Sequence, residues 1–513
     1  MFVQFRWMSI LAALSLAVPA HAAWHEAKSK HFIIYADLRP DELRAYAERL
    51  ERFDQAARKV RAMDDPPLTD AQRLTVFALR DEEAIERLAS REGVRGFYQS
   101  RATGNFAFVP RRAGSNKVEW ELDAQEIFFH EYAHHLQLQF ASVALPPWVT
   151  EGFAEFFATA RIEKNGDVMV GAPPQYRGYG LFNSTGLPVE QMVGVTYGKL
   201  NDEQSDLLYG KGWLLTHYLS FEPSRRGQLS RYVVSIQNGE PAATAAKAAF
   251  GDLQVLDREL ERYKRVKFPA LRVSGQGLAV GNIAIRPLGS GEAAIMDVRI
   301  RSKRGVDQKT APVVAAAARK AAAPYPNDAS VQSALAEAEY DAGNLAAAEA
   351  AADRALAADA NHVHGLIYKG RARMELAKAT KQANWKEVRS WFTRANKIDT
   401  ENAEPLMLFY RSYAEAGERP SKNAVEALLY SVALAPQDDG LRINAVRQLL
   451  SDGRVAEAKT LFAPLAFQPH APAALREISA KVMAAMTAGD GKAALSVLDT
   501  ARQQPAPAAK PRN

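Results

Sequence analysis

The C-terminal part of the chain repeats a pattern of two short amphipathic helices. Four segments begin near residues 333, 366, 406 and 442, and each carries small residues where its two helices would cross. The equivalent positions are Ala355, Ala395, Ala433 and Leu465, which are separated by 40, 38 and 32 residues. Because one such unit cannot bury its apolar face alone, stacked neighbours must share a continuous core. The pattern predicts an all-α solenoid over residues 306–502, followed by a disordered tail at 503–513.

These segments resemble the tetratricopeptide repeat family, whose period is about 34 residues. The Ala-rich stretches at 311–326 and 473–499 look like partial units that cap the array. The resemblance implies that the repeats recruit a protein partner through a concave face. An Ala-rich low-complexity helix is the alternative, but the recurring Tyr/Leu, Ala and Asp positions favour repeats.

The N-terminus predicts export. Residues 1–22 have one arginine, an apolar run from Met8 to Val18 and small residues at Ala20 and Ala22, which is the pattern of a cleavable signal peptide. No later stretch approaches the roughly 20 apolar residues that a membrane helix needs, so we expect no transmembrane segment after cleavage. The location would be the periplasm in a two-membrane bacterium and the outside otherwise.

Composition limits the chemistry and the partners. At 513 residues the chain exceeds the size of a single core, so at least two domains are expected. The net charge of +6 is spread over residues of both signs, and we expect no nucleic-acid binding. The chain has no cysteine, so a bound metal would have to use histidine and carboxylate ligands.

Strand and helix patterns alternate from residue 31 to the middle of the chain. The runs at 31–38, 73–79 and 102–112 predict strands, and the segment at 40–63 predicts an amphipathic helix. Residues 268–305 contain short alternating runs, "NIAIRPL" and "AIMDVRI", which predict a small β connection. A mixed α/β domain over 23–267 is therefore expected to precede the repeats.

The segment "FFHEYAHHLQLQF" carries the strongest chemical signal. On a helix predicted from Asp123 to about Ala141, His130 and His134 are four residues apart and project from one face, where two imidazoles can hold one metal ion. Glu131 places a carboxylate beside that position. A next helix, starting at Pro146, carries Glu151 near its beginning, and a third is predicted to begin near Tyr209.

H-E-x-x-H followed by W-x-x-E-G-x-A is the signature of the gluzincin metallopeptidases. The motifs "HEYAHHL" and "PPWVTEGFAEFF" resemble bacterial exported proteins of the peptidase-MA-like type, related to the thermolysin and M1 aminopeptidase groups. "YGKG" at 209–212 is similar to the segment that carries the transition-state tyrosine of the aminopeptidases. The resemblance covers about residues 24–267 and implies an α+β, thermolysin-like zinc peptidase domain ahead of the tetratricopeptide-repeat solenoid.

Carried over to this chain, the resemblance implies a zinc ion held by His130, His134 and Glu151. Glu131 would be the general base and Tyr209 the hydrogen-bond donor to the oxyanion, while Glu155 would orient a ligand histidine. His135 points about 100° away from His134 and is expected beside the site or at the surface.

The G-x-M-E-N segment that binds the free amine of the substrate in aminopeptidases is missing, which disfavours an exopeptidase of that type. In its place we expect an edge strand over which a peptide lies by strand addition. The residues of this predicted edge strand are Asn105, Phe106, Ala107, Phe108 and Val109.

The sequence leaves three functions open. The leading hypothesis is an exported zinc metallopeptidase that hydrolyses peptide bonds and whose repeats recruit a partner or a protein substrate. The second is a catalytically inactive, peptidase-like scaffold that acts through protein–protein interaction. The third keeps the zinc ion but hydrolyses something other than a peptide.

Overall fold

The computed structural model describes residues 24–92, 94–111, 124–140, 145–183, 187–194, 202–379, 383–466 and 473–503. The predicted signal peptide and nearly all of the predicted tail lie outside these residues. Within them, no helix combines the length and apolar content needed to cross a membrane.

A six-stranded mixed sheet forms the centre of the N-terminal region. Its strand order is β4-β5-β3-β2-β1-β9, with β2, β3 and β5 parallel and the other neighbours antiparallel. The strands are β1 (His25–Lys28), β2 (Phe32–Ala36), β3 (Leu74–Leu79), β4 (Phe97–Arg101), β5 (Gly104–Pro110) and β9 (Ala284–Pro287). A smaller sheet of order β6-β7-β8 contains β6 (Arg161–Ile162), β7 (Val168–Val170) and β8 (Leu271–Val273).

Eleven helices among the described residues accompany the two sheets. They are α1 (Pro40–Arg61), α2 (Glu82–Ala89), α3 (Ala124–Phe140), α4 (Pro147–Ala158), α5 (Gly178–Asn183), α6 (Val189–Gly194), α7 (Asp202–Phe221), α8 (Gln228–Gln237), α9 (Ala242–Phe250), α10 (Leu253–Tyr263) and α11 (Ser290–Arg304).

The prediction that the third helix begins near Tyr209 is wrong, because α7 starts at Asp202. Leu207 and Leu208 are buried in the core, and their burial stabilises the polar first turns of α7, residues 202–206, as part of the helix.

The sheet has a hydrophobic core on each face. Alternate residues of β5 belong to different cores: Ala107 and Val109 pack with α1 and α3, whereas Phe106 and Phe108 pack with α2 and α11. The prediction that residues 105–109 form an edge strand is therefore wrong. β5 lies between β3 and β4, because the chain turns back at Gly104 (φ +128°) and β4 becomes the edge.

The stretch at 268–305 is not a purely β connection. "NIAIRPL" contains β9, which pairs with β1 and so completes the sheet. "AIMDVRI" is instead part of helix α11. Its apolar residues alternate because the helix is buried on two sides: Met296 and Ile300 face the sheet, and Ile295 and Val298 face the helices that follow.

The rest of the chain is an array of antiparallel helix pairs. Its helices are α12 (Ala311–Ala322), α13 (Ala329–Asp341), α14 (Leu345–Ala358), α15 (Val363–Lys378), α16 (Trp385–Ile398), α17 (Ala403–Glu415), α18 (Lys422–Leu434), α19 (Asp439–Ser451), α20 (Val455–Ala466), α21 (Ala473–Thr487) and α22 (Gly491–Gln503).

The repeat register differs by two residues from the prediction in the third unit. The second helices bury Ala355, Ala395, Ser431 and Leu465, each seven residues after another buried residue of its own helix. Ala433 is exposed. With Ser431 in its place the spacings become 40, 36 and 34 residues, which approach the tetratricopeptide period.

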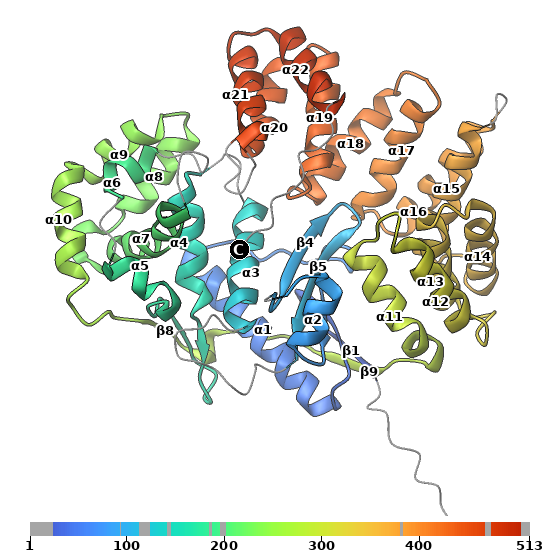
Figure 1. The fold of residues 1–513 in the computed structure, drawn as a ribbon, viewed down its shortest axis with the longest axis horizontal. Helices are drawn as coiled ribbons and strands as arrows, with labels where there is room; N and C mark the ends of the chain where they lie inside the picture. The colour runs from blue at the N-terminus through green and yellow to red at the C-terminus, as the bar shows by residue number, and fades with distance from the viewer. Residues whose placement is uncertain are drawn as a thin grey trace, which may run out of the picture.

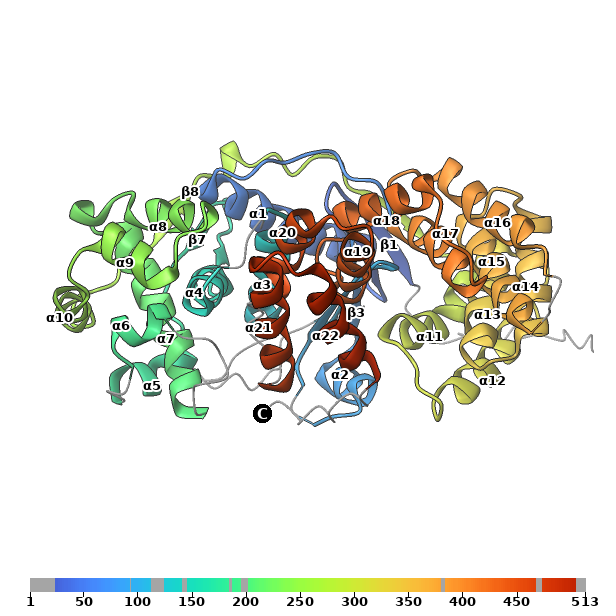
Figure 2. The same cartoon turned by 90° about the horizontal axis from the view of Figure 1, so that it is seen from above.

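Figure 1 shows the sheet between a lobe formed by α4 to α10 and the helical array, which follows α11 and curves above the sheet. In the view from above, α20, α21 and α22 cross over the central region that contains α3 (Figure 2).

The tip of the β4–β5 hairpin meets this array directly. Ala102 is buried beside Leu428 and Val432, and its N–H donates to Asp438 Oδ2 at 2.6 Å.

Candidate metal centre

Three side chains from two adjacent helices converge on one point. His130 and His134 lie one turn apart on α3, with their Nε2 atoms 3.1 Å apart. Oε2 of Glu151, on α4, is 3.4 Å from each of these nitrogens. The carboxylate is fully buried, while the two imidazoles are partly exposed at 14% of their side-chain surface. The three predicted ligands are thus brought together with an opening on the histidine side.

The spacing of the donor atoms fits a small tetrahedral metal ion. Zinc bonds of about 2.0–2.1 Å in a tetrahedron place ligand atoms about 3.3–3.4 Å apart. The observed edges of 3.1, 3.4 and 3.4 Å match this value closely. Two imidazoles and one carboxylate are also a donor set that suits zinc, and they leave a fourth position for a substrate or water.

A close helix contact sets the position of Glu151. Pro147 lies in the first turn of α4, where a missing N–H costs no hydrogen bond. The following Gly152 packs on α7: a β-carbon there would lie 2.4 Å from the Gly212 carbonyl oxygen. A glycine after the ligand glutamate therefore lets α4 and α7 approach closely, and this contact brings α7 and Tyr209 towards the donors.

Sequence reasoning missed two residues that hold Glu155. Tyr176 donates to Glu155 Oε2 at 2.6 Å, and Arg177 Nε donates to Glu155 Oε1 at 3.0 Å. Both come from a short 3₁₀ segment in a loop, where no periodic pattern singles them out. The only available signal was indirect, since a buried carboxylate such as Glu155 requires charged or hydrogen-bonding partners.

Glu155 lies behind the first ligand. Its Oε1 atom is 3.8 Å from Nδ1 of His130, the ring nitrogen that does not face the donor triangle. At this separation the two groups make an ion-pair contact and not a hydrogen bond, so the orienting role of Glu155 stays a prediction. Burial lowers the pKa of His130, but the carboxylates of Glu151, Glu155 and Glu131 outweigh it and the net shift is upward. The site therefore has a negative potential that favours a cation.

Tyr209 stacks beside the same histidine. Its ring lies 6.1 Å from the His130 ring between centroids, at an interplanar angle of 22°. The Arg177 guanidinium covers the tyrosine ring at 4.5 Å from its centroid and also donates to Asp206 at 2.6 Å. Burial first, and then the nearby Glu151 carboxylate, raise the pKa of Tyr209. The phenol therefore stays protonated and can donate a hydrogen bond.

Glu131 and His135 point to different surroundings. Glu131 is partly exposed, and its carboxylate makes no hydrogen bond or ion pair with any described residue. His135 is buried and lies 2.8 Å from the Tyr98 hydroxyl on β4, away from the donor triangle. Burial lowers the pKa of His135 to about 3, which makes it a neutral structural contact and not a surface residue.

The residues of the predicted edge strand do not reach the donors. Asn105 Oδ1 accepts from the Ser100 hydroxyl at 2.6 Å and from Gln437 Nε2, in the helical array, also at 2.6 Å. Its neighbours in β5 are buried between the two cores. The strand that borders α3 with a free edge is β4, through Tyr98.

A second cluster of carboxylates, which surrounds His31, lies under α3. His31 contacts Glu51 through Nδ1 at 2.7 Å and Asp65 through Nε2 at 2.8 Å. Asp54 pairs with Arg58 at 2.9 Å and accepts from the Tyr132 hydroxyl of α3. Burial lowers the pKa of His31, but the carboxylates of Glu51 and Asp54 raise it by more, so the net shift of the pKa is upward. Carboxylates on both ring nitrogens favour the charged form of His31, which would offset part of the negative charge of this cluster.

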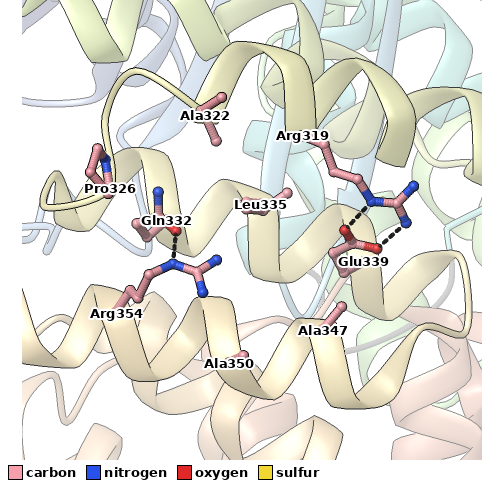
Figure 3. Close-up of a pocket in the computed structure, with 10 residues that line it drawn as sticks. Arg319, Ala322, Pro326, Gln332, Leu335, Glu339, Ala347, Ala350 and Arg354 are labelled. Carbon is pink, nitrogen blue, oxygen red and sulfur yellow. Dashed lines mark hydrogen bonds and ion pairs between the residues drawn. The ribbon is translucent and has the colours of Figure 1, made fainter.

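The helical array has a groove of its own, of about 450 Å³, between α12, α13 and α14. Figure 3 shows two arginines reaching over α13 from opposite sides. Arg319 makes two 2.6 Å bonds to the Glu339 carboxylate. Arg354 donates through its Nε to Gln332 at 2.6 Å, and its terminal nitrogens make no hydrogen bond or ion pair with the described residues.

Comparisons with known proteins concern only part of the chain. No protein-family model and no curated protein sequence matches it. Among solved structures, the chain is similar to a thermophilic TPR protein of Thermus thermophilus, at 19% identity and a TM-score of 0.31; the match covers 37% of this chain and 97% of that one. It is also similar to Pseudomonas aeruginosa pilF, at 18% identity and a TM-score of 0.33, over 42% of this chain and 93% of that one.

Proposed function

We propose that this chain is a zinc-dependent metallopeptidase whose donor set is His130, His134 and Glu151. The observation that carries the proposal is the triangle of donor atoms with edges of 3.1, 3.4 and 3.4 Å. Its support from sequence rests on the motif residues alone, since no family model matches the chain.

Each surrounding residue has a defined task in peptide hydrolysis. Bound zinc supplies Lewis acidity towards water and towards a substrate carbonyl. Glu131, which is free of ion pairs, accepts the proton of the attacking water and passes it to the leaving amine. Tyr209 donates a hydrogen bond to the carbonyl oxygen as negative charge develops on it. Glu155, held by Arg177, keeps the His130 ring in orientation.

The test is zinc content and cleavage of an unstructured protein, casein, by the purified chain. We expect wild type and Glu131→Gln to hold about one zinc ion and His134→Ala to hold little, with cleavage by wild type alone. His364→Ala, which removes an imidazole from the helical array, is the matched control and should behave as wild type. Absence of zinc from wild-type protein prepared without chelator would contradict the proposal.

A second candidate function is protein binding through the helical array. The groove beside Arg354 supports it, because the terminal guanidinium nitrogens there are available to an acidic partner. If the array recruits the substrate, a photoreactive residue at Ala350 in the Glu131→Gln chain should crosslink to casein. The same residue at the exposed Ala433 is the control. Equal crosslinking from both positions would argue against recruitment by this groove.

A further inference from the structure

A cavity of about 380 Å³ lies behind α4, between α1, α7 and α8. Its walls include Val149 and Phe153 of α4 and Leu229 and Val233 of α8. Val149 and Phe153 lie two residues before and after Glu151, about 200° around the helix, so they project from the opposite side. The cavity lies on the side of α4 opposite Glu151, and it also reaches Gln137 of α3, seven residues after His130 on the same helical face. Its volume is within the usual range of small-molecule sites.

One cation of this cavity wall has no ion-pair partner among the described residues. Arg61, the last residue of α1, places its guanidinium over the rings of Phe153, Phe156 and Phe157, at 5.1, 5.5 and 5.8 Å from their centroids. Its Nε is buried and has no hydrogen-bond partner among the described residues. The nearby Asp64 is exposed and makes no ion pair with it. Burial lowers the pKa of Arg61 to about 10.

A second polar atom of the same wall is also unsatisfied. Thr216 Oγ1, on α7, is buried and has no hydrogen-bond partner within the described part of the chain. Native proteins rarely leave buried polar groups without partners, and each exception requires an explanation. Cation–π contacts with phenylalanine offset only part of the cost of burying a guanidinium. The Thr216 hydroxyl lies at the contact between α4 and α7, 2.5 Å from the position of a β-carbon on Gly152, so the charged donor of this wall is Arg61.

We propose that this cavity binds an apolar chain that ends in a carboxylate, with the carboxylate on Arg61 and the chain against Val149, Phe153, Leu229 and Val233. A carboxylate is the anion whose two oxygens match the guanidinium fork. Eight of the other twelve lining residues are apolar, beside Asp64, Gln137, Ser230 and Gln237, so the apolar part of the wall fits a hydrocarbon tail. A fatty acid has this chemistry, and so does the free C-terminus of an apolar peptide.

The experiment is calorimetric titration of the full-length chain with decanoate, and with decanol as the uncharged probe of equal length. Wild type should bind decanoate saturably at one site and decanol much more weakly. Arg61→Met should weaken decanoate binding roughly ten- to a hundred-fold, as expected for hydrogen bonds to a charged group. Arg80→Met, which changes an arginine whose side chain is 81% exposed, is the matched control and should bind as wild type.

Two further readouts keep the proposal testable. Arg61→Met should unfold at a temperature no lower than that of wild type, because it removes a partly buried cation that has no ion-pair partner among the described residues. Leu229→Trp, which fills the cavity and keeps the arginine, should also lose decanoate binding. Equal affinity of wild type and Arg61→Met for decanoate, or absence of saturable binding, would overturn the assignment.

A final arm identifies the source of the carboxylate. A leucyl-leucine peptide with a free C-terminus is compared with its amide as a competitor of decanoate. If the peptide with a free C-terminus displaces decanoate and its amide does not, the site accepts peptide carboxylates as well as fatty acids. If neither peptide displaces decanoate, the site is assigned to fatty acids. Removing zinc with a chelator should leave these affinities unchanged, so the result is independent of the proposed peptidase activity.

Discussion

Replacing Gly152 with alanine tests the helix contact that positions Glu151. The new β-carbon would lie 2.4 Å from the Gly212 carbonyl oxygen and 2.5 Å from Thr216 Oγ1, whereas ordinary contacts begin at about 3.4 Å. α4 and α7 must therefore separate by about 1 Å. Overpacking of this kind costs about 1–3 kcal/mol, and the better helix propensity of alanine returns up to about 1 kcal/mol. For a region of this size a net loss of about 1–2 kcal/mol lowers the melting temperature by roughly 2–8 °C.

Gly210→Ala is the control within α7. Its β-carbon would meet nothing closer than 3.6 Å, so alanine should be neutral or stabilising there. Circular dichroism melts in the presence of chelator measure stability, and competition with a chromophoric chelator measures zinc affinity. We expect Gly152→Ala alone to weaken zinc binding, because α4 carries Glu151. A Gly152→Ala chain that melts at or above the temperature of Gly210→Ala would refute the reasoning.

Three other substitutions have defined outcomes. Arg177→Met should lower zinc affinity roughly 10- to 100-fold while His130 and Glu151 remain, because Glu155 loses its charged partner and keeps only Tyr176; unchanged affinity in the chelator competition would contradict this. The pKa of His31 is raised in the folded protein, so its ion pairs stabilise the fold fully below pH about 6.5 and are lost as the pH rises through the pKa of the folded state. The urea midpoint of wild type should therefore fall more between pH 6 and pH 9 than that of His31→Asn. Parallel curves for the two proteins would count against this. Ala102→Arg should release the β4–β5 hairpin from the helical array, seen as faster hydrogen exchange of hairpin amides, and unaltered exchange would show that the contact is dispensable.

The hairpin contact changes how the helical array can be used. Ala102 is buried among array residues, and Gln437 reaches Asn105 in the next strand. The array is therefore not simply tethered to the N-terminal region, since it holds the sheet edge beside α3. A protein partner would find part of the array surface already covered by the chain's own hairpin. The groove beside Arg354, at the other end of the array, is not involved in that contact.

Local patterns predicted the elements that carry the candidate metal donors. The i, i+4 spacing of His130 and His134 needs only a helix, and a proline at the start of the next segment begins α4 close to the predicted residue. Longer-range relations were harder to predict. Residues 105–109 formed the predicted strand but not an edge, because strand order depends on which segment returns beside it. The alternating run at 294–300 proved helical because it is buried on two sides.

The sequence by itself determined the period of the helical array, the single helical face shared by His130 and His134, and the exclusion of thiolate ligands. Each of these depends on residues a few positions apart or on composition, where backbone geometry leaves little freedom. Only the tertiary structure decided that Glu151 lies within 3.4 Å of both imidazoles, that Arg177 secures Glu155, and that Arg61 lies in an apolar cavity. These relations arise from the packing of segments far apart in the chain, which is set by complementary shape and burial and has no periodic signal in the sequence.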